Sequence, residues 1–422
     1  MSTLITESKS RKELRDMMKR RKALELPNEI IFFNILPRLP PKSLLRFRCV
    51  CKSWDSLIRK PSFIKFHQTT RASNHTHFLI PCQDSKTSKL HIFSAPLDKQ
   101  QLHLTPPTHI LTLPEPRSLR LDRRGFPKMP EPESFFKLQS LKGLHCITYR
   151  GRGALNPVYI FNANTRQLTT LPVVLAINDR PSRSVAFTTY SFHFGFDPLK
   201  DEFKVLCVIT ILYFKIGLRI NFKVFTLGAN EWREVIPMTL SDVENCCFQD
   251  SGVCVSGALH WRHRSDKIIV AFDVGDEQFR SIPVPDGYEN SDIPIADFVF
   301  DFQHLIELGG CLTLIGDKYL VNENIMELWV LKDYQNQVWA KDSIRFPFNW
   351  TSPRPLPICE ISSDEILFLP KCSKDSMSVF YYDSKAEHFR SVKIMEMPQW
   401  LNLNCSQFLQ AQVYQENMRF LQ

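Results

Sequence analysis

Cysteine and histidine side chains gather between residues 246 and 263, where they could hold a zinc ion. Cys246 or Cys247, Cys254, His260 and His263 fall within 18 residues, and thiolates and imidazoles are the side chains that zinc prefers. The sequence has no Cys-x-x-Cys spacing of the kind found in a zinc knuckle. Cys254 and His260 also fit the pattern of ordinary strands. We therefore interpret the group as structural and expect no metal and no cofactor.

The sequence also lacks the short motifs that carry phosphate binding and hydrolysis. It contains no Gly-x-Gly-x-x-Gly, Walker loop, His-Glu-x-x-His or Gly-x-Ser-x-Gly, each of which positions a phosphate, a metal or a nucleophile. No nucleophile and base stand out as a pair. We therefore expect a protein without an active site of its own, which works by binding.

The composition is that of a globular protein rich in β-structure. The 422 residues are 43% hydrophobic and 23% charged, and they include 32 Phe and 28 Pro but only 14 Gly. Many aromatic residues and prolines in short segments favour an all-β fold with many turns. The 12 Cys have no regular spacing, so we expect thiols in a reducing compartment rather than a disulfide framework.

Two segments could be mistaken for a targeting or membrane signal. Residues 1–21 carry alternating charges instead of an apolar core, so no secretory signal is expected. The longest apolar run, Val205–Leu218, is interrupted by Lys215 and is too short to span a bilayer. We interpret it as two strands joined by a turn at Phe214–Gly217, and we expect no membrane partner.

The positive charge is confined to the N-terminal end of the chain. The formal net charge is +9, and residues 1–68 hold 16 Lys and Arg against 6 Asp and Glu, which leaves −1 for residues 69–422. Since phosphate binding needs basic residues on the binding domain itself, we expect no nucleic-acid partner. The basic run Lys9–Lys22 is either a nuclear import signal or a solvated arm. The expected location is the cytoplasm, the nucleus or both.

Residues 26–68 read as a small module of short helices. Ile31, Ile35 and Leu39 step by four and form an apolar stripe on a first helix. Prolines between residues 37 and 41 stop that helix, and Pro41 suits the start of the next. So short a module cannot bury apolar stripes on two faces. One face must therefore meet either the rest of the chain or another protein.

This module closely resembles the F-box of plant F-box proteins. The order of residues that carries the resemblance runs from Leu26-Pro27 through Arg38-Leu39-Pro40 and Lys42-Ser43-Leu44 to Arg46-Phe47-Arg48-Cys49-Val50-Cys51-Lys52-Ser53-Trp54. The resemblance implies that the module binds a Skp-type adaptor, and through it a cullin and a RING protein. The positions expected to contact the adaptor, or to shape the surface that does, are Leu26, Pro27, Ile30, Ile35, Leu36, Leu39, Leu44, Leu45 and Trp54.

From about residue 76 onward, one unit recurs along the chain. Each copy has an apolar strand, a polar turn, and a second strand opened by Leu or an aromatic residue. Successive copies start 47 to 68 residues apart, which fits a four-stranded propeller blade with its loops. We predict a six-bladed or incomplete β-propeller, with a two-sheet β-sandwich as the alternative. The copies are Ile92-Phe93…Leu102, Ile160-Phe161…Leu168, Val224-Phe225…Trp232, Ala271-Phe272…Phe279, Val330-Leu331…Trp339 and Tyr381-Tyr382…Phe389.

Two stretches within this region resemble the plant F-box-associated domain. They are Phe194–Val205, with the sequence FGFDPLKDEFKV, and Val255–Trp261, with the sequence VSGALHW. The second departs from the family pattern at Ser256, where Asn is usual. Independently of the family, Ser256 and the glycine after it read as a turn, and Leu259 and Trp261 share one face of the following strand. The resemblance implies a domain that binds a target protein.

Two long, proline-rich connections are candidates for the target-binding surface. A propeller binds through loops on a rigid scaffold, and arginine and aromatic side chains are typical of interface hot spots. The connections span Pro106–Pro132 and Pro347–Pro357. The expected target-binding residues are Arg120, Arg123, Arg124, Phe126, Phe348, Trp350 and Arg354.

The sequence therefore predicts a multidomain α+β chain. Its parts are a basic arm (1–25), an F-box (26–68), a linker (69–75), a propeller-like domain (76–395) and a C-terminal segment (396–422). The resemblance implies the substrate-recognition subunit of a Skp–cullin–F-box ubiquitin ligase, which brings a target to ubiquitination and proteasomal degradation. The alternative is an adaptor-bound scaffold, or a glycan- or protein-binding module, that does not cause degradation of its partner.

Overall fold

The structure is a computed structural model, and the chain divides into two compact units, one up to Ser73 and one from Asn74. The residues that it describes are 30–70, 76–84, 86–87, 89–98, 103–104, 106–113, 136–149, 157–174, 185–236, 243, 246, 248, 252–263, 267–288, 305–316, 318–347, 356–362, 365–369, 378–393 and 412–421.

The first unit is a cluster of short helices around a small core. A π-helix, η1, and a 3-10 helix, η2, come first; η2 contains Pro37, and the extended residue Leu39 ends it before Pro40. Pro41 opens the next helix, as expected. A further helix, α4, continues past the expected end of the module. The helices are η1 (Ile30–Ile35), η2 (Leu36–Arg38), α2 (Pro41–Phe47), α3 (Lys52–Ile58) and α4 (Pro61–Thr70).

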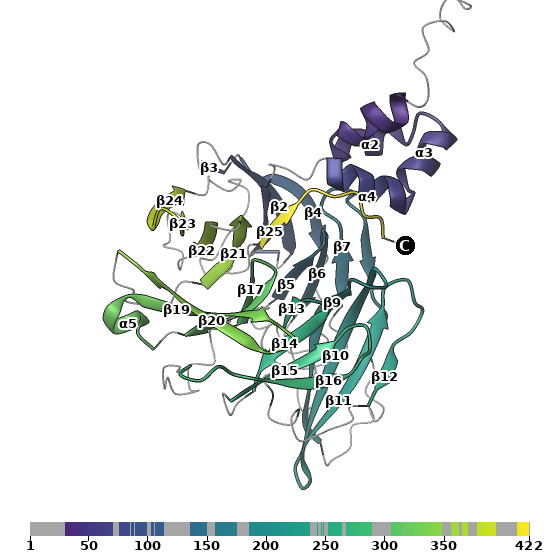
Figure 1. The fold of residues 1–422 in the computed structure, drawn as a ribbon. Coiled ribbons are helices and arrows are strands. Elements are labelled where there is room, and N and C mark those ends of the chain that lie inside the picture. Colours follow the sequence, from purple (N-terminus) through teal and green to yellow (C-terminus); the bar gives the residue numbers. More distant parts are fainter. Residues whose placement is uncertain are drawn as a thin grey trace, which may run out of the picture. The chain divides into compact units, whose positions relative to one another are not determined.

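The second unit contains six antiparallel sheets in its described part (Figure 1). The first sheet has β1 (Thr76–Gln83), β2 (Leu90–Asp98), β3 (His103–Leu104), β4 (Thr108–Leu113) and β25 (Gln412–Gln415). The second has β5 (Phe136–Leu141), β6 (Leu144–Tyr149), β7 (Tyr159–Phe161) and β8 (Leu168–Thr170). The third has β9 (Val185–Asp197), β10 (Glu202–Tyr213), β11 (Gly217–Thr226) and β12 (Arg233–Val235).

The other three sheets follow the same order, and one short helix, α5 (Leu320–Glu323), precedes β19. The fourth sheet has β13 (Val253–Val255), β14 (Ala258–Arg262), β15 (Ile268–Asp273) and β16 (Phe279–Pro283). The fifth has β17 (Leu305–Leu308), β18 (Cys311–Gly316), β19 (Ile325–Asp333) and β20 (Val338–Arg345). The sixth has β21 (Leu356–Ser362), β22 (Glu365–Leu369), β23 (Ser378–Asp383) and β24 (His388–Lys393).

These sheets are the blades of a six-bladed β-propeller. The innermost strands β25, β5, β9, β13, β17 and β21 contact one another in that order, and β21 contacts β25 again, so the ring closes. Apolar clusters fill the spaces between neighbouring blades, for example Leu206 and Phe222 of the third blade against Leu259 of the fourth. A two-sheet sandwich is therefore excluded.

The ring closes through the last strand, β25, which was predicted to lie outside the propeller. β25 pairs with β1 from Thr76 opposite Gln415 to Leu79 opposite Gln412. It completes the first blade, because β1, β2 and β4 supply only its three outer strands. The expected end of the propeller at residue 395 is therefore wrong. The repeat could not reveal β25, because this strand pairs with the beginning of the domain rather than with a neighbour in sequence.

The predicted repeat is the outer hairpin of each blade. Phe161 pairs with Leu168, Phe272 with Phe279 and Tyr382 with Phe389 across the third and fourth strands. An Asp or Asn one or two residues after the apolar residue accepts backbone hydrogen bonds that fold the turn: Asn162, Asp273, Asp333 and Asp383. In the first copy the expected partner Leu102 lies outside the described residues, and Phe93 pairs with His109 instead.

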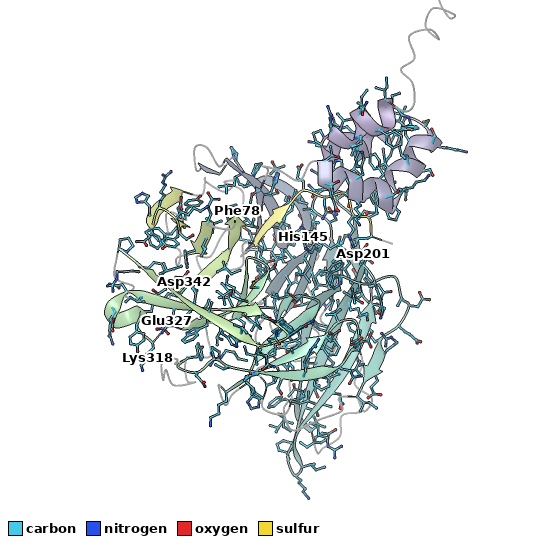
Figure 2. The ribbon with its side chains drawn as sticks, in the orientation of Figure 1. Phe78, His145, Asp201, Lys318, Glu327 and Asp342 are labelled. Carbon is cyan, nitrogen blue, oxygen red and sulfur yellow. The ribbon has the colours of Figure 1, made fainter. Side chains whose placement is uncertain are left out.

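Strand order assigns the connections to two faces of the propeller. Adjacent strands are antiparallel, so the first-to-second and third-to-fourth connections of every blade lie on one face, which we call the turn face. The second-to-third connections and those between blades lie on the other, which we call the loop face. β1 begins on the turn face, and residues 416–421 after β25 lie there too. Asp201 of this face, labelled in Figure 2, accepts a 2.7 Å hydrogen bond from Arg419.

Candidate functional site

The helical unit exposes apolar side chains on its first helix. Ile30, Phe33 and Ile35 of η1 are 40%, 65% and 36% exposed. Val50 and Phe66 of the same unit are also exposed, at 61% and 42%, whereas Leu36 and Leu44 are fully buried in its core. Aliphatic and aromatic side chains left in water on so small a unit are typical of a surface that binds another protein.

The core beneath this surface fixes the ends of the helices. His67 of α4 is buried, and its Nε2 lies 2.9 Å from the carbonyl oxygen of Leu39. Ile58 and Phe63 are buried in the same unit, and the Phe63 ring stacks on that of His67. α4 therefore packs against η2 and against Leu39, the residue that ends it.

The structure divides the expected adaptor-binding positions into three groups. Ile30 and Ile35 are exposed, whereas Leu36 and Leu44 belong to the core and can only shape the surface from below. The half-buried positions are Leu39, Leu45 and Trp54, and Leu26 and Pro27 lie outside the described residues. Phe33 was not among the expected positions, although it lies between Ile30 and Ile35 on the same helix. A large aromatic side chain outside the apolar stripe of Ile31, Ile35 and Leu39 could have identified it as an exposed contact residue.

The charge of this unit is strongly positive. Residues 30–70 contain eight Lys and Arg, and Asp55 is the one acidic residue among them. Arg48 and Arg59 both hold Asp55, with Nε–Oδ1 distances of 2.6 and 3.0 Å. The hydrogen bond from Arg48, and then that from Arg59, lower the pKa of this carboxyl group. The remaining cations have no acidic neighbour in sequence, so the surface suits a partner with acidic side chains.

In the propeller, the expected target-binding residues cannot be placed. Arg120, Arg123, Arg124 and Phe126 lie outside the described residues, and so do the other three: Phe348, Trp350 and Arg354. The strand ends on either side of them can be placed. Leu113 ends β4 and Phe136 begins β5, and both belong to connections of the loop face.

The candidate zinc ligands have structural partners in the part of the chain that the structure describes. His260 Nδ1 lies 3.1 Å from the Val253 carbonyl oxygen, and its Nε2 lies 2.8 Å from the Tyr334 hydroxyl. Cys246 Sγ donates to the Arg262 carbonyl at 3.5 Å. No three described His, Cys, Asp or Glu side chains form a group that could hold a metal ion, and Cys247 lies outside the description.

The VSGALHW stretch is part of the inter-blade packing. Ser256 and Gly257 both have positive φ, 51° and 80°, and form the predicted turn. Trp261 then donates its Nε1–H to His193 Nδ1 of the third blade at 3.2 Å, and its ring packs edge-on against that of His193. Burial lowers the pKa of His260 to about 4, so this histidine is neutral at physiological pH. His260 and Trp261 thus hold neighbouring blades together through hydrogen bonds to Tyr334 and His193.

Comparison with protein families gives the identity of both units. A family model described as "F-box associated beta propeller domain" matches residues 77–415, and one described as "F-box-like" matches residues 23–67. The chain belongs to the F-box associated beta propeller family. Both stretches that resemble the F-box-associated domain lie within the first match. In the described residues, no helix is long and apolar enough to cross a membrane.

Curated relatives with F-box names match nearly the whole chain. F-box protein At2g40925 of Arabidopsis thaliana is 26% identical over 412 residues, which cover 94% of this chain and 93% of the relative. F-box protein DOR of the same plant is 27% identical and covers 88% of each chain. The presence of an F-box and an F-box-associated domain in this order indicates a role in substrate recognition.

Solved structures add only distant likenesses. AztD from Citrobacter koseri is 10% identical with a TM-score of 0.35, and covers 81% of this chain and 98% of its own. A 6-phosphogluconolactonase, described as putative, from Bacteroides uniformis is 11% identical with a TM-score of 0.36, and covers 76% and 95%. Strand pairing and the family match establish the propeller fold.

Proposed function

We propose that this protein is the substrate-recognition subunit of a Skp–cullin–F-box ubiquitin ligase. In this proposal the helical unit binds a Skp-type adaptor, which connects it to a cullin and a RING protein. The propeller binds a target protein for ubiquitination and proteasomal degradation. The protein is then a non-catalytic receptor, and the chemistry belongs to its partners.

The observation that carries the proposal is the surface of η1. It combines exposed Ile30, Phe33 and Ile35 with a helical unit that has eight cations and one anion in residues 30–70. Removing such side chains from water is worth about 25 cal/mol per Å². A partner with an apolar groove and acidic rim would gain both this burial and the attraction between opposite charges.

Adaptor capture tests the first half of the proposal. A purified Skp-type adaptor should bind the full chain, and Phe33→Asp with Ile35→Asp should weaken capture by at least tenfold. The double substitution Leu26→Ala with Pro27→Ala should act in the same direction. The matched control is Leu199→Asp in the propeller, since Leu199 is 95% exposed and its replacement should leave capture unchanged. Equal capture by parent and double variants would contradict the proposal.

The fate of the bound partner tests the second half. Affinity capture with and without a proteasome inhibitor should reveal a propeller-bound protein that accumulates only with the inhibitor. The Phe33→Asp and Ile35→Asp variant should bind that protein as well as the parent does, yet fail to promote its ubiquitination. A partner whose abundance and modification ignore both the inhibitor and the variant would indicate a scaffold instead.

We also propose that the protein resides in the cytoplasm, the nucleus or both. The basic run that ends at Lys19–Lys22 supports a nuclear fraction. Replacing all four residues with Ala in a fluorescently tagged chain should lower the nuclear share of the signal. An unchanged distribution would mean that the run is only a solvated arm.

A further inference from the structure

The hairpin of β10 and β11 is much longer than its equivalents in the other blades. β10 has 12 residues, whereas the second strands of the other five blades have five to eight. At about 3.4 Å per residue, the difference corresponds to roughly 15 to 25 Å of additional strand. The teal hairpin projects beyond the ends of the neighbouring strands in Figure 1. Its turn joins a second to a third strand and therefore belongs to the loop face.

One side of this hairpin stays apolar after it leaves the core. Phe222 of β11 is 1% exposed and packs between the third and fourth blades. Ile220 is only partly buried, and Leu218, two residues further out on the same side, is 51% exposed. At the turn, Ile216 and Phe214 are 64% and 72% exposed. The side that faces the fourth blade thus continues as an apolar surface beyond it.

The fold itself does not require apolar side chains at this tip. The strands β10 and β11 pair without interruption up to Tyr213 and Gly217, so the turn between them is short. Gly217, with φ of 88°, is the left-handed residue that this turn requires. Turns of this kind usually carry small polar side chains. Three large apolar residues in so short a segment therefore indicate a surface that another molecule covers.

The charges beside the tip have a single sign. Between residues 205 and 222 the charged residues are Lys215 and Arg219, and no described residue forms an ion pair with either. An apolar tip with free cations matches a segment that has apolar side chains next to Asp or Glu.

We propose that residues 213–219 bind the target protein directly, through an apolar segment of the target that is flanked by acidic side chains. This inference rests on the proposed function, because it identifies the class of target that the propeller receives. A protein fits better than a lipid surface, since electrostatic membrane binding takes clusters of about four to eight basic residues and this segment has two.

The test uses the purified full chain and a displayed library of random peptides. Selected peptides should combine apolar residues with Asp or Glu. Their affinity should fall at least tenfold for the tip variant, Phe214→Ser with Ile216→Ser and Leu218→Ser. It should fall about fivefold or more for the charge variant, Lys215→Glu with Arg219→Glu. The control, Leu199→Ser with Val338→Ser, removes exposed apolar residues of the turn face and should bind the peptides as the parent does.

Reversal of charge makes the test specific. Peptides whose acidic residues are replaced by Lys should regain binding to the charge variant. The proposal is overturned if no peptide distinguishes the parent from the tip variant, or if the selected peptides lack acidic residues. It is also overturned if only vesicles containing phosphatidylserine separate these two proteins, which would indicate a membrane contact. Adaptor capture should be equal for all variants, so a failure here is distinguishable from a failure of the proposed function.

Discussion

The side-chain amide of Asn417 occupies the space that a side chain at Gly143 would need. A Cβ at Gly143 would lie 1.3 Å from Asn417 Nδ2, and Gly143 has φ of 80°. Asn417 Nδ2 donates to the Lys142 carbonyl at 2.7 Å, and its Oδ1 accepts from Asn162 at 3.0 Å. The contact fixes the segment that follows β25 to the second blade.

We expect Gly143→Ala to destabilise the propeller by about 3 kcal/mol or more, from backbone strain together with a steric clash. Gly310→Ala is the matched control. Gly310 holds the same place in the β17–β18 turn, with φ of 73° but nothing within 4 Å of a Cβ, so it should cost about 1 kcal/mol. Thermal unfolding of the purified chains gives both values.

The pair can also be tested by relieving the clash. Asn417→Ala alone removes buried hydrogen bonds and should cost about 1 to 3 kcal/mol. In the Gly143→Ala background it should cost much less, because it also removes the atoms that the new methyl group meets. Additive effects of the two substitutions would show that the clash does not determine stability.

Glu277 joins the third and fourth blades through two cations. Its Oε1 lies 2.8 Å from Lys204 Nζ and 2.6 Å from Arg233. Because the Lys204 side chain is only 6% exposed, Glu277→Gln leaves a buried charge without its partner and should cost about 3 kcal/mol at neutral pH. Arg233→Gln, at a half-exposed side chain, should cost about 1 kcal/mol or less.

The cost of Glu277→Gln should depend on pH in a defined direction. Burial acts to raise the pKa of Glu277, but hydrogen bonds from Arg233 and Lys204 outweigh it and hold the pKa below its usual 4.5. The carboxylate therefore stabilises the fold above pH 4.5, and this contribution is lost as the pH falls through the folded-state pKa. Unfolding curves of parent and variant should converge in that acidic range; a constant gap would contradict the assignment.

Buried histidines should make the propeller sensitive to mild acid. Burial lowers the pKa of His260 to about 4 and that of His145, labelled in Figure 2, to about 3, from a usual 6.5. The unfolded chain takes up these protons first, so stability should fall as the pH drops from 6.5 toward 4. Because glutamine does not titrate, the His260→Gln variant should lose less Tm between pH 7 and pH 5 than the parent does, by roughly 3 °C. An equal Tm difference for parent and variant would refute this.

The last strand should be essential although it is short. Deleting residues 412–422 leaves β1 without a partner on its inner edge and removes Tyr414 from the packing between the first and second blades. We expect insoluble protein or a broad unfolding transition, as for removal of the sixth outer hairpin, Val379–Ile394. A soluble truncated chain with the parent's melting transition would contradict this.

Local patterns in the sequence predicted the local parts of the fold. The turn at Ser256 and the hairpin around Phe214 follow from residue types within a few positions, and both are confirmed. The outer hairpins were visible where the apolar pair lies on strands joined by one short turn, as for Phe272 and Phe279; the first copy differs, because Phe93 pairs with His109 instead of the expected Leu102. The pairing of Thr76 with Gln415 has no such local signal, so the end of the propeller was misplaced.

The exposed surface of η1, which we propose to bind the adaptor, was only partly predictable, because periodicity shows which residues are apolar but not which of them are buried in a core. Leu36 and Ile35 are neighbours in sequence, yet Leu36 is fully buried and Ile35 is 36% exposed. This difference in burial depends on how the later helices pack against the first one. The spacing of apolar residues along the first helix carries no information about that packing. The exposed tip at Phe214 was likewise predicted as a turn without its surface being recognised.

Because β25 closes the ring, the propeller cannot be completed until the ribosome has synthesised the end of the chain. Ser94 and Tyr414, which share a 2.8 Å hydrogen bond in the first blade, are 320 residues apart in the chain. At about 5 to 20 residues per second, the ribosome needs roughly 15 to 65 s to supply the second partner. The helical unit is complete long before that. A premature stop codon after the fifth blade would therefore yield a chain with a complete helical unit and an open propeller ring, which under the proposed function could not receive a target.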